Sequence, residues 1–250
     1  MTGDTREKAM EVLVSRGMLQ FAGSMNAMGF SIDRVGMEYV RSWFEFYYNW
    51  PGRRVVGFTE PEDIATKLLA DSFSFQAVPG IAEVDNTMDV GSGNGWPGLA
   101  VRLCVPLSKL TLMDSRLGAC QFLSGLLRAS PLSGTSVQQS RAEDMARDKD
   151  FAESFGLVVS RAMAEPAVAL ELCAPLARIG GRVILWCGPG DASLQMPPAL
   201  PELGLSLLGL FKYSLPSGLG RRVLGVYDKT SGLKPGFPRR YSVIIKKPLF

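Results

Sequence analysis

The fold is decided by the stretch Met88-Asp89-Val90-Gly91-Ser92-Gly93-Asn94-Gly95-Trp96-Pro97-Gly98. Its first residues are apolar enough to end a buried strand, and Pro97 suits the first turn of a helix. The three alternating glycines between them can adopt positive φ and carry no Cβ, so the backbone there can approach a ligand closely. A dinucleotide-binding turn would place its third glycine where this chain has Trp96, so the nicotinamide dinucleotide fingerprint is broken.

The spacing Asp-x-Gly-x-Gly-x-Gly, which begins at Asp89, is instead typical of sites that bind S-adenosylmethionine (SAM). A second acid, Asp114, ends the next predicted strand, 23 residues after Gly91. A carboxylate at that place can accept hydrogen bonds from both hydroxyls of an unphosphorylated ribose. The alternative role for Asp114 is to cap a helix that starts near Ser115.

Two short motifs follow the third and fourth predicted strands. Ser140-Arg141-Ala142-Glu143 can present main-chain groups to the edge of an adenine ring. Ser140 and Glu143 also have the spacing of a helix capping box, and both interpretations can hold together. Val159-Ser160-Arg161-Ala162 follows the fourth strand, where a substrate would meet the cofactor.

From about residue 86, short apolar runs alternate with helical stretches, which is typical of βα units on a parallel sheet. Strands are predicted over 87–90, 110–113, 136–139, 157–159 and 183–186, with helices over 97–104, 117–127, 142–147 and 166–176. Two later runs, 205–213 and 223–227, are separated by Pro216, Gly218 and Gly220 and predict an antiparallel hairpin. The pattern predicts an α/β, Rossmann-like fold of the class I SAM-dependent methyltransferases, a seven-stranded mixed sheet with a C-terminal antiparallel hairpin.

Residues 1–82 are predicted to form a helical N-terminal extension, followed by a methyltransferase domain at 83–250. Apolar residues at helical spacing predict helices over 5–22 and 33–49, and a third helix from Pro61 toward Phe73 with Thr59 as its cap. Aromatic residues gather near the end of the second helix and can either stack a flipped base or pack the helices onto the sheet, and we prefer packing. They are Trp43, Phe44, Phe46, Tyr47, Tyr48 and Trp50.

Histidine is absent from the 250 residues. This excludes Ser-His-Asp and Cys-His nucleophiles, His-ligated metals and the usual general base at neutral pH. The four cysteines form no CxxC pair, so we expect no metal site and interpret them as buried apolar residues in a reducing compartment. The N-terminus has no signal-peptide pattern and no run is apolar enough to cross a membrane, so we expect a cytoplasmic protein without a membrane partner.

The formal net charge of +3 is unevenly distributed. Residues 221–250 carry eight basic side chains and one acid, whereas the rest of the chain has a net negative charge. This basic C-terminal segment predicts docking of a polyanion, although its charges could merely solvate a terminal hairpin. The candidate RNA-binding residues are Arg221, Arg222, Arg239, Arg240, Lys246 and Lys247.

Taken in order, the motifs of residues 40–250 resemble a divergent member of one family closely, the bacterial 16S rRNA methyltransferase RsmG, also called GidB, which makes 7-methylguanosine. The resemblance is carried by the stretch 89–99, by Leu112-Met113-Asp114-Ser115, Phe122-Leu123, Ser140-Arg141-Ala142-Glu143, Val159-Ser160-Arg161-Ala162, Gly180-Gly181-Arg182, Phe237-Pro238-Arg239-Arg240 and Lys247-Pro248-Leu249. The chain departs from the family at four polar or basic positions, which hold Leu68, Gly118, Ala119 and Cys187 here.

The resemblance implies SAM as cofactor and 16S rRNA or the small ribosomal subunit as partner, and fold analogy suggests a monomer. It places Arg141 and Arg161 near the cofactor and the target base, where we expect them to assist catalysis. The expected cofactor-binding residues are Asp89, Gly91, Ser92, Gly93, Gly95, Trp96, Pro97, Asp114, Ser115, Ala142, Glu143, Ser160 and Arg161.

The chemistry implied by the resemblance suits a chain without histidine. Guanine N7 carries an in-plane lone pair and no proton at neutral pH, so the protein needs to align the reactants and needs no general base. We expect methylation of guanine N7 in 16S rRNA. The alternatives are a SAM-dependent methyltransferase that acts on a small molecule or a protein, and a non-catalytic relative that binds SAM or RNA.

Overall fold

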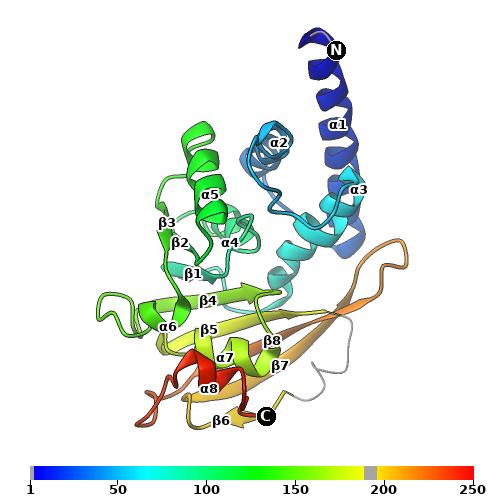
Figure 1. Cartoon of the computed structure of the whole chain (residues 1–250). Coiled ribbons are helices and arrows are strands. Elements are labelled where there is room, and N and C mark those ends of the chain that lie inside the picture. Colours follow the sequence, from blue (N-terminus) through cyan, green and yellow to red (C-terminus); the bar gives the residue numbers. More distant parts are fainter. Residues whose placement is uncertain (1–2, 189–195) are drawn as a thin grey trace.

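The computed structural model describes residues 3–188 and 196–250, and its centre is an eight-stranded sheet with helices on both faces (Figure 1). The strands lie in the order β3-β2-β1-β4-β5-β8-β7-β6. Strands β1 to β5 pair in parallel, whereas β8 runs antiparallel to both β5 and β7. Their bounds are β1 (Asn86–Val90), β2 (Lys109–Asp114), β3 (Thr135–Gln139), β4 (Phe155–Arg161), β5 (Ala177–Cys187), β6 (Ala199–Leu200), β7 (Leu205–Ser214) and β8 (Arg221–Lys229).

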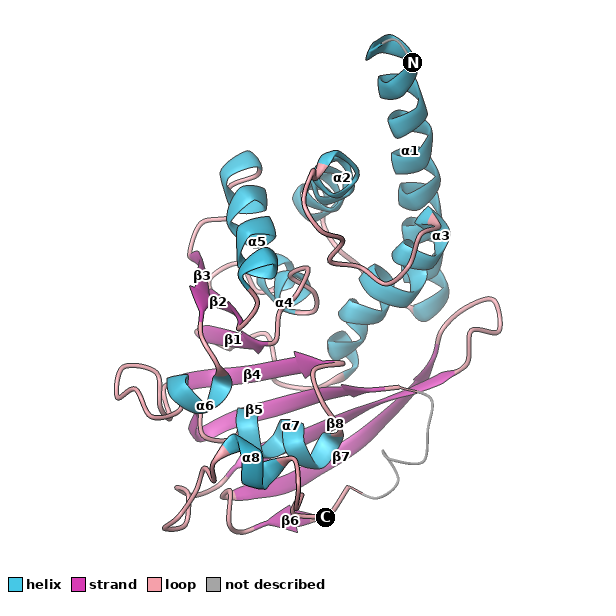
Figure 2. Cartoon of the chain, viewed as in Figure 1, coloured by secondary structure: helices cyan, strands magenta, loops and turns pink. Residues whose placement is uncertain are grey.

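The central strands are buried on both faces because successive side chains enter two different hydrophobic cores. In β4, Leu157 and Val159 enter the first core, and Val158 enters the second. Figure 2 shows the helices that cover the two faces. The first core lies under α1 (Gly3–Met28), α2 (Arg34–Asn49), α4 (Gly98–Cys104) and α5 (Leu117–Ala129), and the second under α6 (Ala142–Met145), α7 (Pro166–Cys173) and α8 (Tyr241–Ile244).

The third predicted helix is divided into three short helical pieces. They are α3 (Pro61–Asp63), a π-helix η1 (Ile64–Ala70) and a 3-10 helix η2 (Phe73–Ala77). The expected cap is wrong, because Glu60 occupies the N-cap position and makes no side-chain capping bond, whereas Pro61 does lie in the first turn. A π-helix inside a helical segment often marks a functional region, and η1 contacts Arg161 at the end of β4.

The N-terminal helices share the first core with the sheet. Trp43 of α2 is fully buried, stacks on Tyr47, and meets Trp96 and Phe122 edge to face. Its indole Nε1 donates a hydrogen bond of 3.1 Å to the backbone oxygen of Asn94, in the glycine turn. The interpretation of these aromatic residues as packing groups is therefore confirmed for Trp43, while the boundary at residue 82 stays a prediction.

The predicted parallel strands and the C-terminal hairpin are confirmed, with two differences. The sheet has eight strands and not seven, because the two-residue strand β6 pairs with β7. A strand of two residues is too short to show a recognisable sequence pattern. The hairpin is also an internal part of the sheet, since β8 lies between β5 and β7. Its last residue, Lys229, is accordingly buried, with 1% of its surface exposed. Among the described residues, no helix combines the length and the apolar character that crossing a bilayer requires.

Candidate active site

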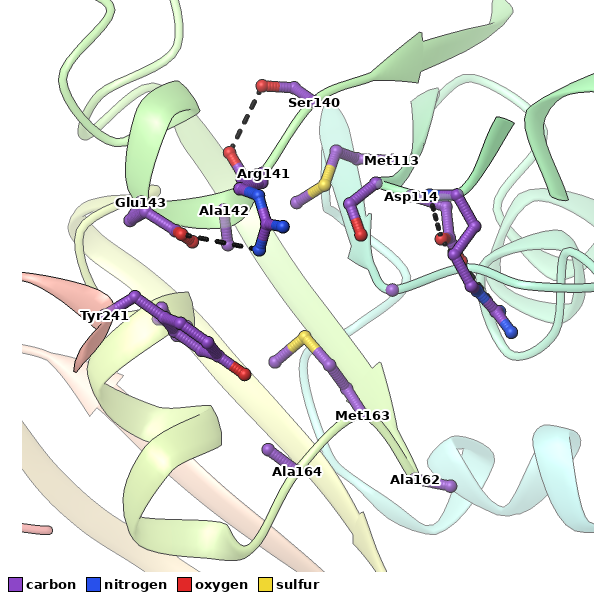
Figure 3. A pocket seen from close by; sticks show the side chains of 14 residues that line it. Met113, Asp114, Ser140, Arg141, Ala142, Glu143, Ala162, Met163, Ala164 and Tyr241 are labelled. Carbon is purple, nitrogen blue, oxygen red and sulfur yellow. Dashed lines mark hydrogen bonds and ion pairs between the residues drawn. The ribbon is translucent and has the colours of Figure 1, made fainter. Parts of the chain in front are cut away.

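A pocket of about 360 Å³ lies where β1, β2, β3 and β4 end. In open α/β sheets, ligands bind at the carboxyl ends of the strands, near the point where the strand order reverses. Here the order reverses between β1 and β4. The pocket is lined by Gly91, Met113, Asp114, Ser115, Arg116, Ser140, Arg141, Ala142, Glu143, Ala162, Met163, Ala164, Leu172 and Tyr241 (Figure 3).

The glycine turn after β1 forms the floor of this pocket. Gly91 has φ +75°, and its N–H donates to the oxygen of Met113 at 2.8 Å, which holds the turn against β2. A Cβ at Gly91 would lie 3.0 Å from Cγ of Met163. Only glycine therefore adopts this conformation without strain and leaves room for the loop that follows β4.

Asp89 fixes the glycine turn from below. Its Oδ2 accepts a 2.8 Å hydrogen bond from the N–H of Gly98, which ties β1 to the start of α4. The carboxylate is 1% exposed, and its Oδ1 has no hydrogen-bond partner in the structure. Burial raises the pKa of Asp89 to about 7, although the bond from Gly98 and the charge of Arg161 lower it in part.

Asp114 ends β2 and presents its carboxylate to the pocket. Oδ2 accepts from the N–H of Gly93 at 2.9 Å and from Nη2 of Arg116 at 3.1 Å. Oδ1 accepts from the backbone N–H and from Nε of Arg116. Burial alone would raise the pKa of Asp114, but the hydrogen bonds from Arg116 and Gly93 outweigh it and lower the pKa, so this carboxylate is ionised at neutral pH.

The predicted capping roles at this edge are not seen. The N-cap residue of α5 is Arg116 and that of α6 is Arg141, and neither helix has a side-chain capping bond. The hydroxyl of Ser140 instead donates to the oxygen of Arg141 at 3.2 Å. Arg141 lines the pocket, with Nη1 at 3.9 Å from Oε1 of Glu143.

Arg161 ends β4 but is turned away from the pocket. Its side chain is 12% exposed and extends toward η1 on the first face of the sheet. Nη1 donates to the oxygen of Leu68 and to Oγ of Ser72, both at 2.8 Å, and lies 3.3 Å from Oδ2 of Asp71. Nη2 donates at 3.3 Å to the oxygen of Trp96. The guanidinium thus joins η1 to the glycine turn, and the structure does not support the expected contact with the target base.

The loop that follows Arg161 forms the opposite side of the pocket. Ala162 has φ +53°, a left-handed conformation that a residue with a Cβ adopts only when its surroundings hold it. Met163 then places its side chain over Gly91. The fixed guanidinium of Arg161 therefore positions a strained loop that shapes the pocket.

The structure brings only part of the expected cofactor-binding set to the pocket. Gly91, Asp114, Ser115, Ala142 and Glu143 line it, together with Arg141. The other expected residues lie behind the lining. Ser160 donates its hydroxyl to the oxygen of Val90, and the Trp96 ring packs against Trp43 and Phe73. Asp89, Ser92, Gly93, Gly95, Pro97 and Arg161 also stand outside the pocket lining.

These features define a class of protein. The sheet order with an antiparallel β8, the glycine turn after β1 and the acid that ends β2 are those of a class I SAM-dependent methyltransferase. The residues present fit SAM, because the pocket lining joins the glycine turn at Gly91 to the Asp114 carboxylate, an acceptor for ribose hydroxyls, and to the main chain of Ala142 and Glu143.

The particular family follows from comparison with known proteins. The chain matches the family model of GidB, rRNA small subunit methyltransferase G, over residues 49–192, and it belongs to this family. It is 37% identical to the ribosomal RNA small subunit methyltransferase G of Carboxydothermus hydrogenoformans over 76% of this chain and 82% of the relative. With the protein of the same name from Symbiobacterium thermophilum, the identity is 34% over 96% of this chain and 100% of the relative.

A solved structure supports the fold alone. The chain resembles the cofactor-bound structure of Rv0187 from MTB with a TM-score of 0.57 and 14% sequence identity. The likeness covers 78% of this chain and 91% of that one.

Proposed function

We propose that this protein transfers the methyl group of SAM to N7 of a guanine in 16S rRNA. The observation that carries the proposal is the pocket at the end of β2, where an ionised Asp114 faces the glycine turn in a chain of the rRNA small subunit methyltransferase G family. Bound SAM supplies a methyl group on a positively charged sulfur. Its relatives are named for small-subunit ribosomal RNA, and this substrate would place the protein in the bacterial cytoplasm.

The residues of the chain have a positioning task in this reaction. In-line displacement requires that the nucleophile, the methyl group and the leaving sulfur lie on one line. Asp114 would hold the ribose, and the Gly91 turn and the Met163 loop would limit how the ligand can lie. Because N7 has no proton to lose, the reaction needs no general base. Of the two arginines that line the pocket, Arg116 is paired with Asp114, so Arg141 would orient the guanine through its O6 atom.

The basic segment would bind RNA on two separate parts of the molecule. Arg221 begins β8 and pairs with Ser214 of β7. Because Val223 pairs with Cys187, the last residue of β5, Arg221 lies beyond the carboxyl end of β5. It is therefore at the same edge of the sheet as the pocket. Arg240 is exposed at the start of α8, which also borders the pocket. Lys229 and Arg239 are less available, because each pairs with an acid, Glu153 and Glu171 respectively.

The experiment that tests the proposal identifies the methylated nucleoside. The protein is incubated with methyl-labelled SAM and unmodified small ribosomal subunits, and the RNA is digested to nucleosides. We expect the label in 7-methylguanosine, its loss with Asp114→Ala, and its retention with the matched surface variant Asp150→Ala. Label in another nucleoside would refute the target atom, and no label beside measurable SAM binding would point to another acceptor or to a non-catalytic protein.

Salt dependence tests the RNA surface separately. Each phosphate contact that is lost should reduce the slope of log affinity against log salt by about 0.7 to 0.9. The double variant Arg221→Gln with Arg222→Gln should therefore flatten the slope by up to about 2. An unchanged slope would remove the hairpin from the RNA surface.

A further inference from the structure

The C-terminal segment brings an aromatic side chain to the SAM pocket. We propose that Tyr241 is a cofactor-binding residue that packs its ring against the adenine of SAM. It is one of the residues that line the pocket, and it comes from α8, far along the chain from the glycine turn. The inference deepens the account of this site and requires only the cofactor, so it can be tested without RNA.

Two anchors hold α8 in place on either side of Tyr241. Before it, the guanidinium of Arg239 forms a bidentate pair with Glu171 of α7, in which Nε donates to Oε1 at 2.7 Å and Nη2 donates to Oε2. The Glu171 side chain is 0% exposed, so water screens this ion pair less than it would an ion pair on the surface, and the pair fixes the start of α8 to α7. After it, Ile244 is fully buried in the second core.

Between these anchors, the Tyr241 ring extends into the pocket. Figure 3 shows it beside Glu143 and directed toward Met163, with Arg141 above it. The residue is 39% exposed, so the ring is not covered by protein. A flat group that entered the pocket could lie against the ring and against the thioether of Met163, and both contacts favour an aromatic ligand.

The position of Tyr241 favours the adenine over the other parts of SAM. Asp114 is the acceptor for the ribose hydroxyls, and the segment Ser140–Glu143 is where the sequence places the adenine edge. Tyr241 lies on the side of the pocket that carries Glu143 and Ala164. The adenine, attached directly to the ribose, is the aromatic part of SAM that this wall can contact.

The test measures the binding of two ligands by calorimetry, SAM and adenosine alone, with the full chain and no RNA. Removal of one stacked aromatic partner from a base typically weakens binding by at least about fivefold. Tyr241→Ala should therefore raise the Kd of both ligands about tenfold. Tyr241→Phe keeps the ring and should stay within about twofold of the original protein, as should the control Val243→Ala, an exposed apolar residue of the same helix.

A second variant tests whether the Arg239 anchor acts through Tyr241. Arg239→Met should also weaken SAM binding, and it should add little to the loss when it is combined with Tyr241→Ala. A full additional loss in the double variant would refute this anchoring role. The proposal itself fails if Tyr241→Ala leaves both Kd values unchanged, if it weakens SAM but not adenosine, or if it changes only the KM for RNA.

Discussion

Replacing Arg161 with methionine should lower the free energy of unfolding by about 3 to 5 kcal/mol, the usual cost of removing one partner of a buried ion pair. Methionine keeps much of the apolar volume but none of the donors that bridge η1 and the glycine turn. Within the described ranges, the Asp71 side chain, which is 7% exposed, would keep the 2.6 Å hydrogen bond from the hydroxyl of Tyr213 and the more distant charge of Arg222. Burial already raises the pKa of Asp71 despite the opposing charge of Arg161, so the unpaired carboxylate would be costly.

The matched control is a surface pair of similar chemistry. Arg178 lies 2.8 Å from Asp85, closer than the 3.3 Å between Arg161 and Asp71, but the side chains of the surface pair are 45% and 60% exposed. Exposed pairs contribute about 0 to 1 kcal/mol because water screens them. Distance alone would therefore rank Arg178→Met as the more harmful change, and burial ranks Arg161→Met far above it.

The assay is urea denaturation at neutral pH of the original protein, Arg161→Met, Asp71→Asn, the double variant and Arg178→Met. Residues in direct contact should show an interaction energy of about 0.5 to 3 kcal/mol in the double-mutant cycle. The reasoning is refuted if Arg161→Met costs no more than Arg178→Met, or if the effects at positions 71 and 161 are additive.

Three further changes test the pocket itself. The pKa of Asp89 is raised to about 7 in the folded protein, from about 3.9 in an unfolded chain. Between these two pH values the folded state binds a proton that the unfolded state has lost. The free energy of unfolding should therefore fall by up to about 4 kcal/mol as the pH rises from 4 to 7. Asp89→Asn should flatten that dependence in urea titrations across this range, and an unchanged profile would assign it to other groups. Arg116→Ala should strengthen SAM binding by up to about fivefold in calorimetry, because Arg116 occupies acceptor sites on Asp114 that the ribose would need; weaker binding would show instead that Arg116 contacts the cofactor. Gly91→Ala should cost about 1 to 2 kcal/mol of stability for its φ of +75° and also weaken SAM binding, and normal affinity would show that the turn relaxes freely.

Prediction from sequence worked best where function depends on local backbone geometry. The turn at Gly91 and the acid at Asp114 are separated by one helix, and the parallel pairing of β1 with β2 brings them together. A strand, a turn and the end of the next strand can all be recognised from neighbouring residues. This part of the site could therefore be derived before the structure was known.

The direction of Arg161 could also have been found from the sequence. Side chains alternate along a strand, and Leu157 and Val159 both enter the first core. Arg161 continues that series and so points toward the N-terminal helices, away from the pocket. The expectation followed the position of the residue at the strand end and neglected which face it occupies.

Tyr241 could not have been placed from its sequence pattern. It lies on a four-residue helix whose position depends on a long-range ion pair between Arg239 and the buried Glu171 and on the burial of Ile244 in the second core. Neither the length of the helix nor its composition indicates which part of the sheet it covers. Contacts of this kind are fixed by tertiary packing, which motif spacing does not encode.

The shared core of the N-terminal helices also has a consequence for synthesis on the ribosome. Trp43 is made about 80 residues before Phe122, against which it packs. At a translation rate of about 5 to 20 residues per second, roughly 4 to 16 s pass between the synthesis of α2 and that of its partner on α5. During that interval the apolar side of α2 lacks its partner on α5, so we expect that slower translation or a lack of chaperones would reduce the yield of folded protein.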